Sequence, residues 1–222
     1  LSPLDGRYYS SAKELNAYFS EAALMQYRIY VEVEYLLALA KQKEIRKRLL
    51  IHDKEQSKLR KLYQSFDLNA AKEIKEIETK INHDVKAIEY YIQNKTRRSL
   101  HPWIHFALTS EDVNNISYSL MWKHALEKVY LPSVLSLQRK LLDLIREHRK
   151  SPMLSLTHGQ PATPTTFGKE IRVFYNRIER QIVKLKKGTL LAKMSGATGT
   201  WSAHNVAFAS VDWFKFTSKF VM

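Results

Sequence analysis

Cysteine is absent from the 222 residues, which excludes disulfide bonds and thiolate metal sites and fits a reducing compartment. Glycine and proline are scarce, at six residues each, so the chain is neither collagen-like nor a low-complexity linker. No apolar run approaches the ~18 residues that cross a bilayer, and no signal-peptide pattern opens the chain. The apolar residues make up 45% of the chain and can form a core, so we expect a folded protein. Together, these absences lead us to expect it in the cytoplasm.

The motifs of several enzyme classes are also missing. The chain has no His-Glu-x-x-His pair for zinc, no Gly-x-Ser-x-Gly elbow of a hydrolase and no Walker loop. The glycines at positions 196 and 199 lack the spacing of a dinucleotide-binding fingerprint. Chemistry must therefore be sought in other polar loops.

Positive charge is what the chain has in excess. Lysine and arginine number 36 against 22 aspartate and glutamate residues, which gives a formal charge of +14. Such a field attracts nucleic acid, phosphorylated metabolites and acidic surfaces alike, and basic residues on solvated helix faces produce the same total. Charge alone therefore selects no substrate.

Apolar residues recur with helical spacing almost throughout, which predicts an all-α protein with few or no strands. The clearest helix runs from Phe167 to Leu185, with Pro164 before it and Gly188 after it as start and stop signals. Other helices are predicted over residues 21–41, 43–65 and 70–95 with a break near Asn82, after the capping-box pair Thr109 and Asp112, after Pro132, and over 213–222.

The segment from Thr96 to Trp103 interrupts the helical pattern and is the predicted domain boundary. We expect a small helical domain over residues 1–98 and the first part of a long-helix bundle over 99–222. The chain starts at Leu1 rather than at methionine, and its last helix has barely begun at Met222. We therefore expect a piece of a longer protein.

Two polar loops lie in the first half of the chain. A glycine turn ends in Arg7 and Tyr8, where a guanidinium can bind phosphate, although an exposed turn is the simpler interpretation. The triplet Asn82, His83 and Asp84 separates two helices. Asp84 is a candidate cap for the second of them, and the polar neighbours of His83 can fix its tautomer.

Further polar loops lie in the second half. Thr109 and Ser110 open a helix, and a helix N-terminus is a ready site for a carboxylate or phosphate. Asn114 and Asn115 are poor helix formers in the following turn, which favours a polar role in a site. His158 precedes two prolines that stiffen its loop, and a loop with Gly196 and Gly199 allows close backbone approach.

Taken in order, five segments resemble the adenylosuccinate lyases of the fumarase/aspartase superfamily. The resemblance spans essentially all of the chain, and the TSED and THGQPATP blocks are its most specific parts. They favour the purine enzyme over fumarases, aspartases and argininosuccinate lyases. The five segments are SPLDGRY from Ser2, NHDVKAIEY from Asn82, HFALTSEDVNN from His105, THGQPATPTTFGKE from Thr157 and SGATGTWSAHN from Ser195.

The resemblance implies a β-elimination that needs neither a metal ion nor an organic cofactor. Fumarate would leave adenylosuccinate, giving AMP, and would leave succinyl-aminoimidazole carboxamide ribotide in purine biosynthesis. A base removes a proton next to a carboxylate, and an acid protonates the departing nitrogen. The family pattern makes His158 that acid and gives His83 a supporting or shared role.

The same resemblance implies the substrate-binding residues. Arg7 and Tyr8 would bind the nucleotide phosphate, and Asn82 and Asp84 would line the site. Thr109 and Ser110 would hold the succinyl carboxylates, and Thr157 would assist beside His158.

One departure from the family pattern concerns the catalytic base. In the family this base is a serine on a mobile loop with the pattern S-S-x-M-P-x-K-x-N, and nothing in this chain matches it. By resemblance the complete protein is a homotetramer whose sites combine loops from three subunits, with no membrane or nucleic-acid partner. We therefore expect the 222-residue chain alone to be inactive.

Three alternatives stay open at this point. Another fumarate-releasing lyase, such as argininosuccinate lyase, shares the superfamily pattern. A basic helical module that binds RNA accounts for the charge but not for the five segments, and the chain lacks interleaved aromatic and basic residues. A scaffold that keeps the fold without activity also fits, because the base loop is unseen.

Overall fold

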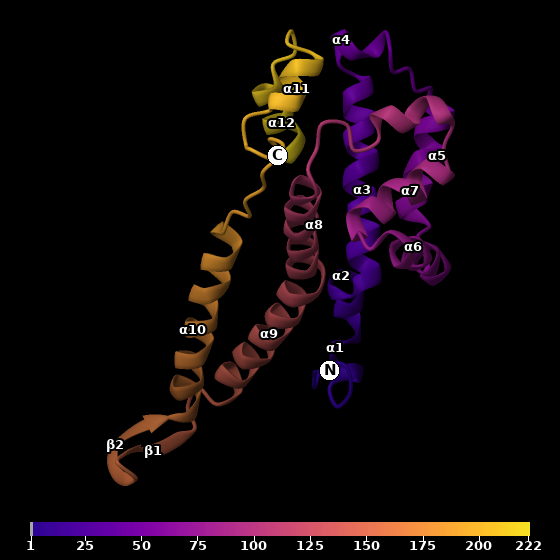
Figure 1. Ribbon diagram of the computed structural model, residues 1–222. Coiled ribbons are helices and arrows are strands. Elements are labelled where there is room, and N and C mark those ends of the chain that lie inside the picture. Colours follow the sequence, from indigo (N-terminus) through magenta and orange to yellow (C-terminus); the bar gives the residue numbers. More distant parts are fainter. Residues whose placement is uncertain (1) are drawn as a thin grey trace. The chain divides into compact units, whose positions relative to one another are not determined.

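The computed structural model describes residues 2–222 and is built almost entirely of helices (Figure 1). Its contacts divide the chain into two compact units. Unit 1 combines the residues up to Lys123 with Leu191–Met222, and unit 2 is His124–Leu190. The predicted division between residues 98 and 99 concerns domains of the complete fold and stays a prediction.

Unit 1 contains most of the short helices and the longest buried one. In chain order its elements are α1 (Tyr9–Ala12), η1 (Lys13–Leu15), α2 (Asn16–Phe19), α3 (Glu21–Ala40), α4 (Lys43–Arg46), α5 (Asp53–Gln64), α6 (Leu68–Ile81), α7 (Asp84–Asn94), η2 (Arg98–Trp103), α8 (Ser110–Ala125), α11 (Ser202–Ala207) and α12 (Trp213–Val221).

Helix α3 forms the centre of unit 1, where α5, α6 and α7 pack against it (Figure 1). It begins where the Ser20 hydroxyl accepts the Ala23 N–H at 3.1 Å, as an N-cap serine does. Ile29, Val33 and Leu36 are at most 1% exposed, so apolar burial drives the packing. The α12 rings of Phe216 and Phe220 pack edge-on against Tyr35, both at 5.9 Å.

Most of the predicted helices of unit 1 are confirmed. The break near Asn82 falls where that residue adopts φ 54° and ends α6, a conformation that asparagine tolerates well. The single helix predicted over residues 43–65 is wrong, because α4 ends at Arg46 and α5 begins only at Asp53. Leu49 and Ile51 between them are buried, so the chain turns inward to place them in the core.

Unit 2 is a helical hairpin extended by a small sheet. It contains η3 (Leu126–Tyr130), α9 (Leu131–Glu147), β1 (Pro152–Thr157), β2 (Gln160–Thr166) and α10 (Phe167–Lys187), and α9 packs along α10 (Figure 1). Both predicted helices are confirmed, with the Thr166 hydroxyl capping α10 through the Lys169 N–H. The π-helical turn η3 directly precedes α9, whose second residue, Pro132, lacks the N–H of a regular turn.

The two strands occupy the segment that the sequence predicted as a stiff loop. They pair antiparallel from Pro152 and Thr166 to Thr157 and Gln160, with an irregularity between Leu154 and Leu156. The all-α class holds, since these are the two strands of residues 2–222. Prolines in β2 concealed the strand, because proline donates no ladder hydrogen bond and survives only on free edges.

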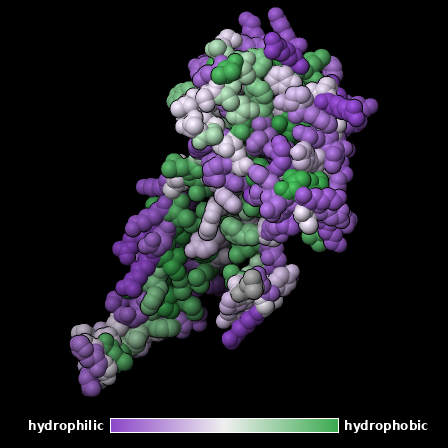
Figure 2. Space-filling model, viewed as in Figure 1, coloured by the Kyte–Doolittle hydropathy of each residue, from purple (hydrophilic) through white to green (hydrophobic). Residues whose placement is uncertain are grey.

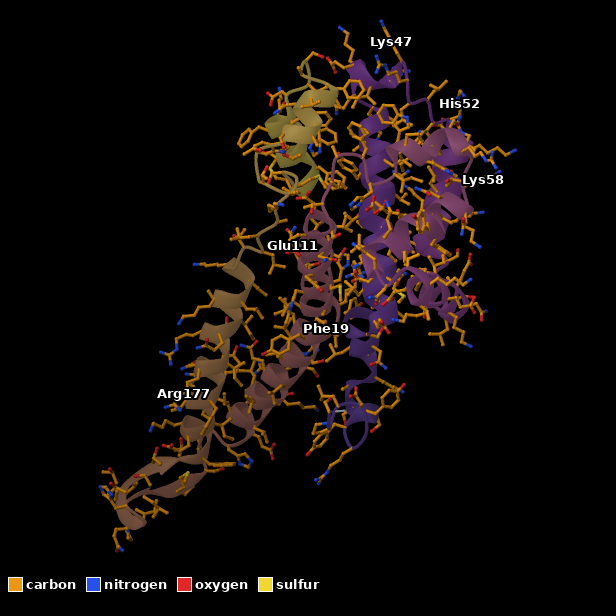
Figure 3. All side chains as sticks on the ribbon, viewed as in Figure 1. Phe19, Lys47, His52, Lys58, Glu111 and Arg177 are labelled. Carbon is orange, nitrogen blue, oxygen red and sulfur yellow. The ribbon has the colours of Figure 1, made fainter. Side chains whose placement is uncertain are left out.

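Basic side chains lie on the outside of both units. Lys58 and Arg177 project away from their helices, as Lys47 does from the end of α4 (Figure 3), and hydrophilic atoms line the outer edge of α10 (Figure 2). Many cations are therefore solvated, as one interpretation of the charge predicted. Across residues 2–222, the apolar stretches of the helices are too short to traverse a bilayer.

Candidate active site

A stripe of polar side chains runs along the buried face of α3. Arg28, Glu32 and Tyr35 follow one another by four and three residues, which places them on one face of a helix. They are 5%, 2% and 0% exposed and lie among buried apolar residues of the same helix. Burying a polar group costs free energy unless the group is hydrogen-bonded, so the partners of these three residues show which segments the buried polar network holds together.

Arg28 joins two of the predicted site segments. Its Nη2 donates to Asp84 Oδ2 at 2.7 Å, and its Nε donates to Asn114 Oδ1 at 2.9 Å. Asp84 is the first residue of α7, and Asn114 lies one turn after Ser110 at the start of α8. One buried guanidinium therefore holds the starts of both helices, and Asn114 has the polar role that the sequence indicated.

His83 caps α7, whereas Asp84 was the predicted cap. The His83 Nδ1 accepts the Lys86 N–H at 3.1 Å, which assigns the proton of the neutral ring to Nε2. Asp84 instead uses Oδ1 for the neighbouring Val85 N–H and Oδ2 for Arg28. The backbone thus fixes the tautomer of His83, whose side chain stays 53% exposed and free to meet a ligand.

The Asp84 carboxylate is held in its charged form. Burial alone would raise its pKa, but the charge of Arg28, the Val85 N–H and the hydrogen bond from Arg28 together lower the pKa below its ordinary value. Half of the side chain is exposed, so a negative charge stands beside His83 with its nearest oxygen 3.9 Å from Nδ1.

Glu32 holds the segment that leads into α8. Its two oxygens meet the His105 ring at 2.5 Å and the His105 N–H at 3.1 Å. Burial opposes protonation of His105, but the hydrogen bond and charge of Glu32 and the charge of Glu89 raise the pKa of the ring. His105 keeps φ at 58°, an uncommon conformation that the double contact to Glu32 supports.

One of the two side-chain bonds of the predicted capping box is present at the start of α8, namely the bond to the Asp112 carboxylate, whereas the Thr109 carbonyl takes the place of its hydroxyl. The Thr109 N–H donates to Asp112 Oδ2 at 3.0 Å, and the Asp112 N–H donates to the Thr109 carbonyl. Ser110 is the first residue of the helix, next to Glu111, which marks this turn in Figure 3. The N-terminal dipole and unpaired amides of such a turn favour an anion.

Asp112 also holds the glycine loop of the fifth segment. Its fully buried carboxylate accepts the N–H groups of Ser195 and Gly196, both at 3.1 Å, and meets Lys193 Nζ at 2.8 Å. Asn115 and Ser119 continue this row along α8 with hydrogen bonds to the backbone of residues 193 and 191. Asn115, for which the sequence favoured a polar role in a site, therefore joins α8 to the backbone of Lys193.

Tyr35 completes the polar stripe. Its hydroxyl donates to the Phe106 carbonyl at 3.0 Å and lies 3.0 Å from Nε2 of His204, which is fully buried. His204 Nε2 must then donate to Tyr35, which leaves its Nδ1 an acceptor without a partner. Burial lowers the pKa of His204, against a smaller opposing effect of Asp112, and keeps the ring neutral.

Thr157 and His158 lie in unit 2, at the tip of the β-hairpin. Thr157 pairs with Gln160, and the two residues between them, His158 and Gly159, have φ of 50° and 74°. Two positive φ values in a two-residue loop are the signature of a type I′ turn. The His158 side chain is exposed there and carries the strain of a left-handed conformation at a non-glycine residue.

The structure gathers the site residues of unit 1 only in part. Asp84, Thr109 and Ser110, with their neighbours Asn82 and His83, belong to the two helix starts that Arg28 joins. Arg7 and Tyr8 lie in the N-terminal turn, where the guanidinium sits 5.5 Å above the Tyr8 ring. Within residues 2–222, no hydrogen bond or ion pair connects Arg7 or Tyr8 to the Arg28 cluster.

Several residues of this polar network were not foreseen as site residues. They are Arg28, Glu32, Tyr35 and Lys193. The spacing of the first three by four and three residues was visible in the sequence, but Gln26 and Glu34 of the same helix are polar as well, so the spacing alone did not single them out. In the described part of the chain, no group of three or more histidine, aspartate or glutamate side chains could hold a metal ion.

Comparison with known families decides the relationship of this chain. A family model described as Lyase matches residues 6–220. The chain belongs to this lyase family. Its relatives include a protein named adenylosuccinate lyase from Dictyostelium discoideum, 41% identical over the whole chain and 49% of the relative. Another protein of that name, from Escherichia coli K12, is 42% identical over the whole chain and 50% of its length.

This lyase chain therefore spans about half the length of the curated relatives it matches. Solved structures agree on the fold. A fumarate lyase from Mesorhizobium sp. BNC1 superposes with a TM-score of 0.75, covering 94% of this chain and 48% of its own at 19% identity. A β-carboxy-cis,cis-muconate cycloisomerase from Acinetobacter calcoaceticus sp. ADP1 gives 0.72, with 96% and 49% covered at 19% identity. The predicted resemblance and helical fold class are confirmed.

Proposed function

We propose that the complete protein containing this lyase chain is an adenylosuccinate lyase, which releases fumarate from adenylosuccinate and from succinyl-aminoimidazole carboxamide ribotide. The observation that carries the proposal is the identity of about 40%, along the whole chain, to proteins named adenylosuccinate lyase. The family model over residues 6–220 supports the same reaction class.

The reaction breaks one C–N bond of the succinyl group. A base removes the proton from the carbon next to a carboxylate, and the electron pair is delocalised into that carboxylate. The pair then forms the double bond of fumarate as the C–N bond electrons leave with nitrogen, which an acid protonates. His158 is the proposed acid, because imidazole transfers protons near neutral pH and an exposed tip can reach a bound substrate.

The helix starts joined by Arg28 are the proposed carboxylate end of the site. Thr109 and Ser110 would bind the succinyl carboxylates, since hydroxyls and free amides of a helix N-terminus favour anions. His83 supports proton transfer with its exposed Nε2–H side, and Asn82 and Asp84 line the same end.

The remaining roles concern the rest of the substrate. Arg7 and Tyr8 would bind the phosphate, for which a guanidinium supplies paired donors, and Thr157 would orient the substrate beside the acid. No step of this scheme is assigned to a metal ion or organic cofactor.

We also propose that the complete protein is a cytoplasmic homotetramer. Large apolar side chains of unit 2 are exposed, including Leu156 (67%) and Phe174 (58%), and Figure 2 shows hydrophobic atoms gathered over α9 and α10. An isolated two-stranded hairpin is marginally stable in water, so contacts with other subunits would stabilise it. A cytoplasmic location suits phosphorylated substrates that do not cross membranes freely.

The test is fumarate release by the complete protein, with adenylosuccinate and argininosuccinate offered separately. We expect release from adenylosuccinate only. Release from argininosuccinate only would replace the proposed substrate, and release from neither would overturn the activity. In the last case, RNA binding that weakens steeply with salt would favour the nucleic-acid alternative.

His158→Ala provides the matched variant in that assay. Loss of a positioned acid typically costs ~10²–10⁴-fold in rate, so we expect a decrease in that range. Exposed His52→Ala is the control, because it removes an imidazole from the start of α5, a helix outside the proposed site. Equal activity of wild type and His158→Ala would remove His158 from the mechanism.

A further inference from the structure

We propose that Arg28 is a positioning residue of the site, which sets the starts of α7 and α8 relative to each other. The inference deepens the proposed function and rests on it for the identity of the reaction. Arg28 is not among the residues that the family resemblance assigns to the site. It stands on the geometry of one buried guanidinium between the two segments that carry His83 and Ser110.

The burial of Arg28 indicates a specific role. Its side chain is 6% exposed, whereas its partner Asp84 is 51% exposed. Removing a guanidinium from water is costly, and a surface partner returns only part of that cost. An apolar residue at this position of α3 would pack with less penalty, so the arginine is better explained by what it orients than by stability.

The two bonds of Arg28 leave from different nitrogens of one rigid plane. Nη2 fixes Asp84, and Nε fixes Asn114, so the separation of the two acceptors is set by the guanidinium itself. A lysine ammonium carries the same charge but cannot reproduce two fixed directions. A lysine at this position would therefore test the positive charge separately from the two fixed donor directions of the guanidinium.

The consequence falls on the neighbours of both acceptors. His83 precedes Asp84 and caps the same helix through Nδ1, so a shift of Asp84 also moves the imidazole. Asn114 lies four residues after Ser110, one turn along α8, so a shift of Asn114 also moves the first turn of that helix. Displacements of about 1 Å are sufficient to cost ~10²-fold in rate.

Helix α3 offers a matched control. Arg60 of α5 binds Glu34 of α3 through Nε at 2.8 Å and Nη2 at 3.0 Å, a bidentate pair with no contact to α7 or the start of α8. Arg60→Gln and Arg28→Gln each remove one arginine–carboxylate pair of α3. Only Arg28→Gln removes a link between the two helix starts.

The kinetic test uses the complete protein with adenylosuccinate. We expect Arg28→Gln to lower kcat by ~10²-fold with a smaller change in KM, Arg28→Lys to recover part of that loss, and Arg60→Gln to stay within about twofold of wild type. Wild-type activity that survives in Arg28→Gln would overturn the proposal while leaving the proposed function intact. Inactivity of the wild type would refute the proposed function instead.

Amide hydrogen exchange decides the positioning role independently of any activity. In Arg28→Gln we expect faster exchange in peptides covering the first turns of α7 and α8, and in Arg60→Gln no change in those peptides. Unchanged exchange at both helix starts in Arg28→Gln overturns the proposal, whatever the outcome of the assay. Faster exchange throughout the protein also overturns it, because that result marks a general loss of stability.

Discussion

Asn115 pairs with the backbone of Lys193 through both ends of its side-chain amide, across 78 residues of sequence. Nδ2 donates to the Lys193 carbonyl at 3.0 Å, and Oδ1 accepts the Lys193 N–H at 2.7 Å. The contact reproduces the pairing of neighbouring strands with one side chain in place of a strand. The pairing therefore joins two parts of unit 1, namely α8, which precedes unit 2 in the sequence, and the segment of Lys193, which follows it.

We expect Asn115→Asp to destabilise the complete protein by about 1–3 kcal/mol, because the Lys193 carbonyl loses its donor and faces a carboxylate. The measurement is urea denaturation at a fixed protein concentration. Asn176→Asp, at an exposed position of α10, is the matched control and should change the free energy of unfolding by less than about 0.5 kcal/mol. Equal effects of the two substitutions would contradict the role of the pairing.

The His105–Glu32 contact predicts a pH dependence of stability. The pKa of His105 is raised in the folded protein, so its stabilising contribution is complete below the ordinary value of ~6.5 and is lost as pH rises through the folded pKa. The buried His204 has a lowered pKa and acts in the opposite sense, costing stability as pH falls below ~6.5.

Comparison of His105→Gln with wild type isolates the first of these effects. We expect the difference in stability between the two proteins to be largest at mildly acidic pH and to shrink as pH rises. Thermal unfolding at a series of pH values measures this difference. The charged groups facing His105 are Glu32, Glu89 and, beyond Glu89, Lys86, so all three remain in both proteins. A difference that grows with pH would show that the sign is wrong.

Gly168 joins the first turn of α10 to the end of α9. A Cβ at this position would lie 2.8 Å from the His148 carbonyl oxygen and 2.9 Å from that of Ile145, both backbone atoms. We expect Gly168→Ala to destabilise by about 1–3 kcal/mol despite the higher helix propensity of alanine. Gly6→Ala, which meets nothing within 4 Å, should be close to neutral in the same thermal unfolding experiment.

At the hairpin tip, the backbone conformation of His158 can be tested separately from its proposed role as an acid. Asparagine favours the positive φ that His158 adopts, so His158→Asn should keep the hairpin at least as stable as wild type. We expect its fumarate release to fall by ~10²–10⁴-fold all the same, because an amide is no proton donor of suitable pKa. Activity of this variant within tenfold of wild type would mean that the histidine serves the turn.

Helices were the part of this fold that the sequence predicted best. The bounds of α10 follow from local signals, Pro164 before the helix and Gly188 after it, and the structure adds the hydroxyls of Ser20 and Thr166 as caps of α3 and α10. The interruption between α4 and α5 did not follow, because it depends on the burial of Leu49 and Ile51 in a core assembled from distant helices. The hairpin was hidden by its prolines for the same kind of reason, since edge pairing is decided by the partner strand.

The sequence motifs of the candidate site could be predicted, but the buried residues that hold its loops in place could not. His83, Ser110 and His158 stand in segments whose order matches a family, so the chain could be related to it before any geometry was known. Arg28 and Glu32 carry no such motif, and their role depends on which loops meet α3. Tautomers and caps were also beyond the sequence, because His83 accepts a backbone N–H where Asp84 was expected to do so.

The polar stripe on α3 binds three loops, so the directions in which its residues leave the helix position all three of them. Each residue added to an α-helix turns all that follow by about 100°, so a single insertion between Arg28 and Tyr35 would point one partner away from its loop. An insertion of seven residues would nearly restore the direction while lengthening the helix by about 10 Å. Length changes in this short interval should therefore be among the least tolerated in the chain, although no residue within it needs to touch the substrate.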